Sequence, residues 1–156
     1  MTIGRRGLSL AFAATVFSGR ARAGGGGGSV NDTAGVALHG YDPVAYVVDR
    51  KAVPGSPEFG VTWQGIPYRF ATDAHRAMFI ADPARFVPEF GGFCALAAAY
   101  DDKATIEPQA FDVVGDRLYV LHNMRALEAW RRDIPGNIAR AQTNWPHTQT
   151  LPGVSH

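Results

Sequence analysis

Two stretches of the chain alternate between hydrophobic and polar residues with the period of a β-strand. In the first, residues 61–70 contain the turn sequence WQGI, in which Gly65 can supply the positive φ of a tight hairpin turn. In the second, FDVV and RLYVL flank Gly115-Asp116 over residues 111–121. The pattern therefore predicts two β-hairpins.

A third alternation covers residues 44–48, in which Val44, Tyr46 and Val48 would share one face of a short strand. The chain then turns at Asp49-Arg50-Lys51. The following segment 54–59, PGSPEF, is rich in proline and glycine and predicts a surface loop before the first hairpin.

Helical spacing follows each predicted hairpin. Thr72 is a good N-cap for a helix in which His75, Met78 and Phe79 share a face that packs on the sheet. Asp82-Pro83 ends this helix and begins another short one.

Near the C-terminus, Asn123 can cap a helix that includes Trp130, and Pro135-Gly136 breaks it. A last helix carries Trp145 and ends before Pro146. Both tryptophans are expected to anchor these helices in the core.

These elements predict an α+β fold, in which the hairpins form a small antiparallel sheet with short helices and a C-terminal helical pair. The domain is expected over residues 36–146, followed by a disordered tail over 147–156. No internal repeat is apparent in the sequence.

The first 35 residues have a different character. Arg5-Arg6 precede an apolar run over 8–17 that is too short to span a bilayer, and Ala21-Arg22-Ala23 offers a cleavage site. We interpret residues 1–23 as a signal peptide of the twin-arginine type, with a general secretory signal as the alternative. Residues 24–35 would form a glycine-rich flexible linker. The mature protein is therefore expected in the periplasm, soluble and not inserted in the membrane.

The composition and charge of the chain limit the kinds of partner that the protein can bind. Hydrophobic residues at 46% and charged residues at 19% are ordinary for a globular protein. Four of the fifteen basic residues lie in the leader, so the remainder is mildly acidic and has no cluster of lysine or arginine. This composition argues against nucleic-acid binding.

Several spaced motifs resemble one known family. The chain reads YRFAT at 68–72 and GYDPVAY at 40–46, GGFCA at 91–95, and DIPG and NWP at 133–136 and 144–146. In this order they resemble the YHS domain family, in its exported proteobacterial form. The resemblance implies a YHS-like fold and a metal-binding role, although Ala45 and Ala71 stand where the module usually has cysteine or histidine.

The resemblance implies a metal site, with copper favoured, at Cys94, His39 and His75, with Met78 as a further possible ligand. At least two of these side chains would have to converge. We expect weak or no Zn²⁺ binding, and Cu(I) binding only if Cys94 is accessible. Each candidate also has a structural alternative: Cys94 as a buried thiol, and His75 as a packed side chain.

Two other functions stay open. Tyr41, Tyr46, Trp63 and Tyr68, beside Asp42, could line a metal-free pocket for a small molecule or a protein. A thiol-dependent redox enzyme would need Cys94 exposed beside a base. The usual catalytic motifs of hydrolases, metalloproteases and phosphate-binding enzymes are absent from the sequence, so a non-enzymatic role is favoured. Asp42 is expected to hold its loop by accepting backbone N–H groups.

Overall fold

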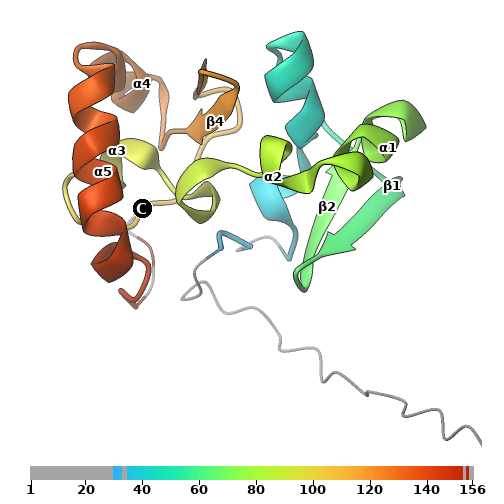
Figure 1. The fold of residues 1–156 in the computed structure, drawn as a ribbon, viewed down its shortest axis with the longest axis horizontal. Coiled ribbons are helices and arrows are strands. Elements are labelled where there is room, and N and C mark those ends of the chain that lie inside the picture. Colours follow the sequence, from blue (N-terminus) through green and yellow to red (C-terminus); the bar gives the residue numbers. More distant parts are fainter. Residues whose placement is uncertain (1–29, 33–34, 153, 155–156) are drawn as a thin grey trace, which may run out of the picture.

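Two β-hairpins, each followed by helices, organise the part of the chain that the computed structural model describes, residues 30–32, 35–152 and 154 (Figure 1). The predicted signal peptide, 1–23, lies outside these residues, as does most of the predicted linker. Asn31 belongs to that linker, yet it is buried. Its backbone N–H donates to the carbonyl of Gly91 and its side chain to the carbonyl of Gly92. Packed structure therefore begins before residue 36.

The elements divide into two halves in chain order. The first half contains η1 (Ala37–Gly40), η2 (Ala45–Asp49), β1 (Ser56–Trp63), β2 (Ile66–Phe70), α1 (Asp73–Ala81) and α2 (Pro83–Phe86). The second half contains η3 (Glu89–Gly92), α3 (Ala95–Ala99), β3 (Phe111–Val114), β4 (Arg117–Val120), α4 (Met124–Arg131) and α5 (Ile134–Thr148).

The α+β class is confirmed, and both predicted hairpins are present. Trp63 pairs with Ile66 across the first turn, and Val114 pairs with Arg117 across the second. The hairpins form two separate two-stranded sheets rather than one sheet. The second hairpin instead contacts the first half through β4, which lies against the helical segments η2 and α2.

Two local predictions in the first half are wrong. Residues 45–49 form a π-helix instead of a strand, because Asp42 accepts backbone N–H groups at its start and Val44, Tyr46 and Val47 are all buried. The segment 54–59 is not simply a loop, because β1 already begins at Ser56.

Both predicted N-caps are confirmed. The Thr72 hydroxyl accepts the backbone N–H of His75, and the Asn123 side chain accepts that of Ala126. The predicted inward face of α1 is only partly correct. Phe79 is fully buried, but Met78 is 37% exposed.

The C-terminal helices differ from the prediction at both ends of α5. Asp133 caps α5 by accepting the N–H of Gly136, so Pro135 and Gly136 lie in the first turn and the break precedes them. The helix continues through Pro146 to Thr148, which is buried. Beyond it, the ammonium of Lys103 donates to the carbonyls of Gln149 and Leu151. These contacts hold the start of the predicted tail against the protein.

The two halves repeat one arrangement, contrary to the impression given by the sequence. Each has a left-handed 3₁₀ turn ending in glycine (η1, η3), then a short helix (η2, α3), a hairpin, and two helices. The first half lies on the right of Figure 1 and the second on the left. The fold therefore consists of two structural repeats.

Equivalent residues of the two halves are 51 positions apart from the hairpins onward. The turn residues with positive φ are Gln64 and Gly65 in one half, and Gly115 and Asp116 in the other. The ring of Tyr68 lies 4.9 Å from that of Phe79 at an interplanar angle of 35°. The equivalent pair, Tyr119 and Trp130, is 5.1 Å apart at the same angle.

Before the hairpins the spacing is 52. The backbone N–H of Asp42 donates to the carbonyl of Val53, and that of Cys94 donates to the carbonyl of Ala104. The carbonyls of Asp42 and Cys94 each accept the N–H of the residue four positions later in the helix. The first left-handed residues after the two short helices are Arg50 and Asp101, which are 51 apart. The segment from the cap to the left-handed residue is therefore one residue longer in the first half, where the helix has a π-helical turn instead of an α-helical one.

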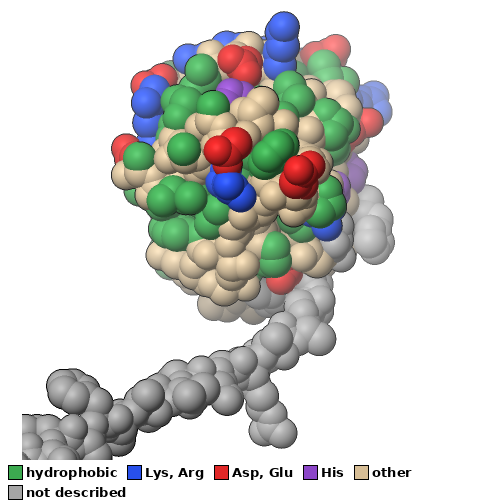
Figure 2. All heavy atoms as spheres, turned by 90° about the vertical axis from the view of Figure 1, so that its right-hand side faces the viewer, with side chains coloured by type: hydrophobic (Ala, Val, Ile, Leu, Met, Phe, Trp, Pro, Cys, Tyr) green, Lys and Arg blue, Asp and Glu red, His purple; other side chains and the backbone are tan. Residues whose placement is uncertain are grey.

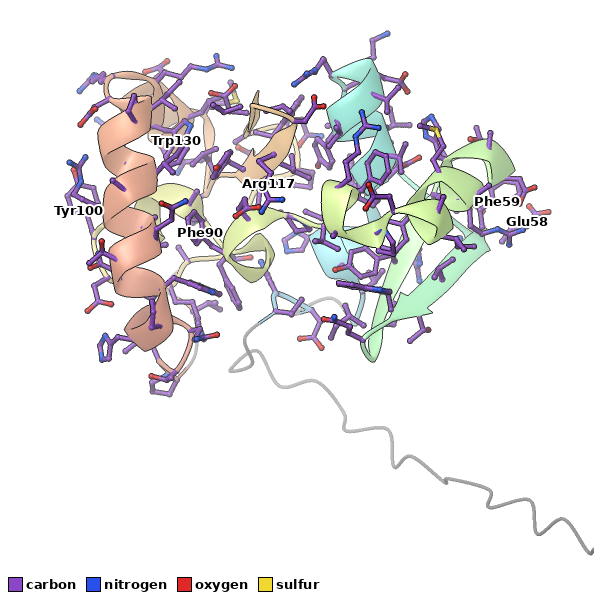
Figure 3. The ribbon with its side chains drawn as sticks, in the orientation of Figure 1. Glu58, Phe59, Phe90, Tyr100, Arg117 and Trp130 are labelled. Carbon is purple, nitrogen blue, oxygen red and sulfur yellow. The ribbon has the colours of Figure 1, made fainter. Side chains whose placement is uncertain are left out.

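The core joins the halves. Tyr46 of η2 donates its hydroxyl to the carbonyl of Pro108, and its ring meets that of Phe111 edge-on at 4.8 Å. Trp130 is fully buried in the second half, beside the upper part of α5 in the view of Figure 3. Trp145 is half-buried against Phe90. The prediction that the two tryptophans anchor these helices is confirmed for Trp130 and holds in part for Trp145.

Candidate functional site

Asp42 lies between η1 and η2 with no part of its surface exposed. One carboxylate oxygen accepts the backbone N–H groups of Val44 at 2.8 Å and Ala45 at 3.1 Å. The other accepts the N–H of Ala71 at 2.9 Å, at the end of β2. The predicted capping role of Asp42 is confirmed, and the carboxylate fixes η2 against the first hairpin.

The same carboxylate holds His75 of α1. Nδ1 of the imidazole lies 2.6 Å from Oδ2 of Asp42. Both oxygens of Asp42 already accept N–H groups, so the proton of this contact belongs to the imidazole. Nε2 is then the free ring nitrogen, and it lies 3.6 Å from Oδ2 of Asp49 at the end of η2. That separation exceeds a hydrogen bond.

The exposure of these three side chains increases from the interior of the protein toward the solvent. The side chain of Asp42 is 0% exposed, that of His75 is 17% exposed, and that of Asp49 is 45% exposed. The imidazole is therefore oriented from behind by a buried carboxylate while its other nitrogen faces a solvent-accessible carboxylate. Such an arrangement can hold a cation or a proton between Nε2 and Asp49.

The second half shows what the fold itself requires at these positions. Cys94 stands in the place of Asp42, and its sulfur accepts the N–H of Ala97 at 3.5 Å together with backbone N–H groups of Leu96 and His122. Ala126 stands in the place of His75, and Tyr100 in the place of Asp49. The repeat therefore keeps its cap with neither a carboxylate nor an imidazole.

The other predicted metal ligands lie elsewhere. Cys94 is 2% exposed in the core of the second half, and burial raises the pKa of its thiol. Burial also lowers the pKa of His39, whose Nε2 lies 3.4 Å from the hydroxyl of Thr105. Among the described residues, no group of three or more His, Cys, Asp and Glu side chains is placed to hold a metal ion. The structure brings His75 together with Asp42 and Asp49.

The aromatic residues predicted to line a pocket belong to the core. Tyr46 is 0% exposed and Tyr68 is 4% exposed, and the half-buried Tyr41 and Trp63 pack against the same cluster. Burial raises the pKa of Tyr68 to about 12. The hydroxyl of Tyr41 accepts a hydrogen bond from the side chain of Gln109 at 3.2 Å.

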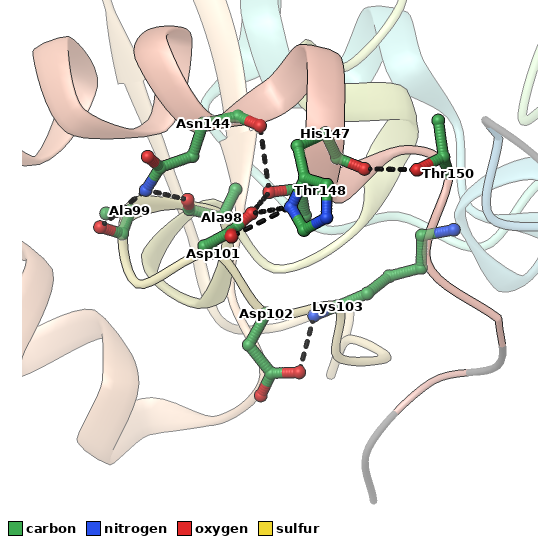
Figure 4. A network of polar contacts seen from close by, with 9 residues as sticks. All are labelled: Ala98, Ala99, Asp101, Asp102, Lys103, Asn144, His147, Thr148 and Thr150. Carbon is green, nitrogen blue, oxygen red and sulfur yellow. Dashed lines mark hydrogen bonds and ion pairs between the residues drawn. The ribbon is translucent and has the colours of Figure 1, made fainter.

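A second histidine–carboxylate pair lies at the C-terminal end of α5 (Figure 4). Nδ1 of His147 is 2.8 Å from Oδ2 of Asp101, and the hydroxyl of Thr148 donates to Oδ1 at 2.7 Å. The side chain of His147 is 66% exposed and that of Asp101 is 42% exposed. This pair fastens α5 to the end of α3 and offers a surface comparison for His75.

Sequence reasoning missed Asp49, which was expected only to turn the chain. Its role depends on the π-helical turn, and the alternation over residues 44–48 gave no sign of that turn. The structural repeat was also hidden, because few side chains are identical between the halves. The signal that could have revealed it is a pattern of three residues, a glycine followed by an aromatic residue and a capping residue. This pattern begins at Gly40 and again at Gly92.

No known protein family, characterised protein or solved structure matches the chain. Within the described residues, every helix is too short or too polar to cross a membrane. The face formed by β1, β2 and α1 carries acidic and basic side chains scattered among hydrophobic ones (Figure 2).

Proposed function

We propose that this protein binds a divalent transition-metal ion, copper(II) in preference to zinc, through Nε2 of His75 and the carboxylate of Asp49. The observation that carries the proposal is the orientation of His75 by the buried Asp42, with Asp49 opposite its free nitrogen. A metal-binding histidine commonly donates its other N–H to a carboxylate in this way. The second half folds around the same cap without these three side chains.

The donor set favours copper(II). Imidazole nitrogen and carboxylate oxygen both suit this ion, which heads the affinity order of the divalent first-row metals. Metal bonds of about 2.0–2.2 Å to each donor can span the 3.6 Å between Nε2 and Oδ2. Two protein ligands leave the remaining positions to water, whereas a structural zinc site closes with four. Burial of Cys94 argues against Cu(I) binding at its sulfur.

The wider setting of the proposal comes from the sequence. A YHS-type module, which the chain resembles, would account for a metal-binding role, and the leader would deliver the protein to the periplasm. There the protein would bind its ion without catalysing a reaction. A soluble binding module fits the absence of any membrane-spanning helix from the described residues.

The test is a copper(II) titration of metal-free protein, followed by electron paramagnetic resonance and calorimetry. We expect one equivalent with a single imidazole nitrogen in the coordination sphere. His75→Gln should abolish this site, and Asp49→Asn should lower its affinity by about 10–100-fold. His147→Gln, at the exposed pair with Asp101, is the matched control and should leave the affinity unchanged.

Asp42→Asn separates orientation from ligation. It keeps the size of the side chain but weakens the hold on Nδ1, and an affinity loss of about 10–100-fold is expected of such an outer partner. The proposal fails if the wild-type protein binds no stoichiometric copper(II), or if His75→Gln binds it as the wild type does. Zinc binding tighter than copper(II) binding would refute the preference.

A further inference from the structure

The extra residue of η2 lies between the two ends of the proposed site. Counting from the cap, η2 reaches its left-handed terminal residue, Arg50, one position later than α3 reaches Asp101. The N–H of Arg50 donates to the carbonyl of Ala45, five residues earlier, as a π-helix requires. Single π-turns of this kind are often found at functional sites.

One added residue changes the direction of every side chain that follows it. In an α-helix each residue turns the chain by about 100°, so an insertion re-aims the last side chain relative to the cap. Here the cap, Asp42, also holds His75, so the cap and the imidazole form one fixed frame. The side chain that the π-turn aims at this frame is Asp49. In the uninserted helix the corresponding residue, Tyr100, is 71% exposed.

Within η2 the residue that can be removed with least damage is Val48. Tyr46 is 0% exposed and Val47 is 3% exposed, whereas Val48 is 44% exposed. The buried residues of η2 therefore keep the order that the equivalent residues have in α3. The extra length is accommodated on the solvent side.

We infer that the one-residue insertion in η2 helps to build the metal site, because the π-turn lies between the cap that holds His75 and the carboxylate of Asp49. The inference rests on the proposed function and adds the device that gives the first half its second ligand. The contribution of Asp49 to metal binding then depends on the register of the helix. Val48 acts as a positioning residue because it adds one residue to the chain, and its side chain is not required.

Deletion of Val48 tests this directly. The variant should keep the fold and the contact between His75 and Asp42, while its copper(II) affinity falls by about 10–100-fold, as in Asp49→Asn. Combining the deletion with Asp49→Asn should produce no further loss, since both remove the same ligand. Val48→Ala, which keeps the residue count, is the matched control and should bind as the wild type does.

A metal-free readout separates the two proposals. The ring ¹⁵N chemical shifts of His75, measured by NMR without metal, should change alike in the deletion and in Asp49→Asn, and should stay unchanged in Val48→Ala. If the wild-type protein binds no copper(II), the proposed function fails while this comparison still decides the positioning. Unchanged His75 shifts in the deletion variant would overturn the inference.

A second variant covers the case in which the deletion does not fold. Exchanging the two residues, Val48→Asp with Asp49→Val, keeps the length of the π-turn and moves the carboxylate by one position. We expect the same affinity loss and the same direction of ¹⁵N shift change. Wild-type affinity or wild-type shifts in the exchanged protein would overturn the inference.

Discussion

Cys94 occupies in the second half of the molecule the position that Asp42 occupies in the first. Both accept backbone N–H groups from the helix that follows and from the end of the second strand of their hairpin. Only Asp42 also binds an imidazole. Comparison of the two positions separates the capping of backbone N–H groups, which stabilises the fold in both halves, from the binding of the imidazole, which belongs to the candidate site.

The two caps should differ in their contribution to stability. Asp42→Ala leaves three N–H groups and the His75 ring without a partner, and each unsatisfied buried group costs about 1–3 kcal/mol. Cys94→Ala removes a weak sulfur acceptor and should cost about 0.5–2 kcal/mol, as the loss of a cap does. Urea denaturation measures both. Equal losses would mean that the carboxylate contributes no more than the thiol.

The thiol of Cys94 should be unreactive in the native protein. Burial raises its pKa, so at neutral pH it stays protonated, and the nucleophilic thiolate forms only at a pH above its ordinary range. Reaction with a disulfide reagent should be about 10³-fold slower or more than in urea, because it requires opening of the core. Comparable rates in the two conditions would place the thiol at the surface.

Phe79 and Trp130 provide a matched pair from the two halves. Each is fully buried against the tyrosine of its own hairpin, so replacement of either by alanine should cost about 3–5 kcal/mol. Trp130→Phe should be far milder, because the indole N–H has no hydrogen-bond partner among the described residues. Thermal and urea denaturation report the losses. A negligible loss at one site alone would show that the halves do not share a packing scheme.

His39 should make the protein less stable in mild acid. Burial lowers its pKa below the ordinary 6.5, so as the pH falls through that range the unfolded chain gains a proton before the native protein does. The free energy of unfolding therefore decreases as the pH falls. In His39→Asn, whose side chain tolerates the positive φ of this residue, the decrease between about pH 6.5 and pH 5 should be smaller. Parallel stability curves for the two proteins would exclude His39 as the cause.

Much of the fold could be predicted because its signals are local. The hairpin turns need glycine at Gly65 and Gly115, and the helices begin at Thr72 and Asn123, whose side chains accept N–H groups only three residues away. Hydrophobic spacing located Phe79 and Trp130 on buried faces. In each case the cause lies within one helical turn or one hairpin.

The candidate site could not be predicted in the same way, because it joins segments far apart in the chain. The carboxylate of Asp42 contacts Ala71 and His75, which follow the first hairpin. The other backbone N–H groups that it accepts belong to a helical segment whose sequence alternates like a strand. The register of that helix decides where Asp49 points. Neither spacing nor composition records a single inserted residue.

The structural repeat also bears on how the chain reaches its native state. Each half contains its own hairpin, caps and buried aromatic pair, so the contacts that can form early are close in sequence in both halves. We therefore expect the two hairpins to form early, although Leu118 and Val120 of the second hairpin complete their burial only against the core of the first half. The contact between Tyr46 and Phe111 joins the halves and would form last, as a docking step that completes the core.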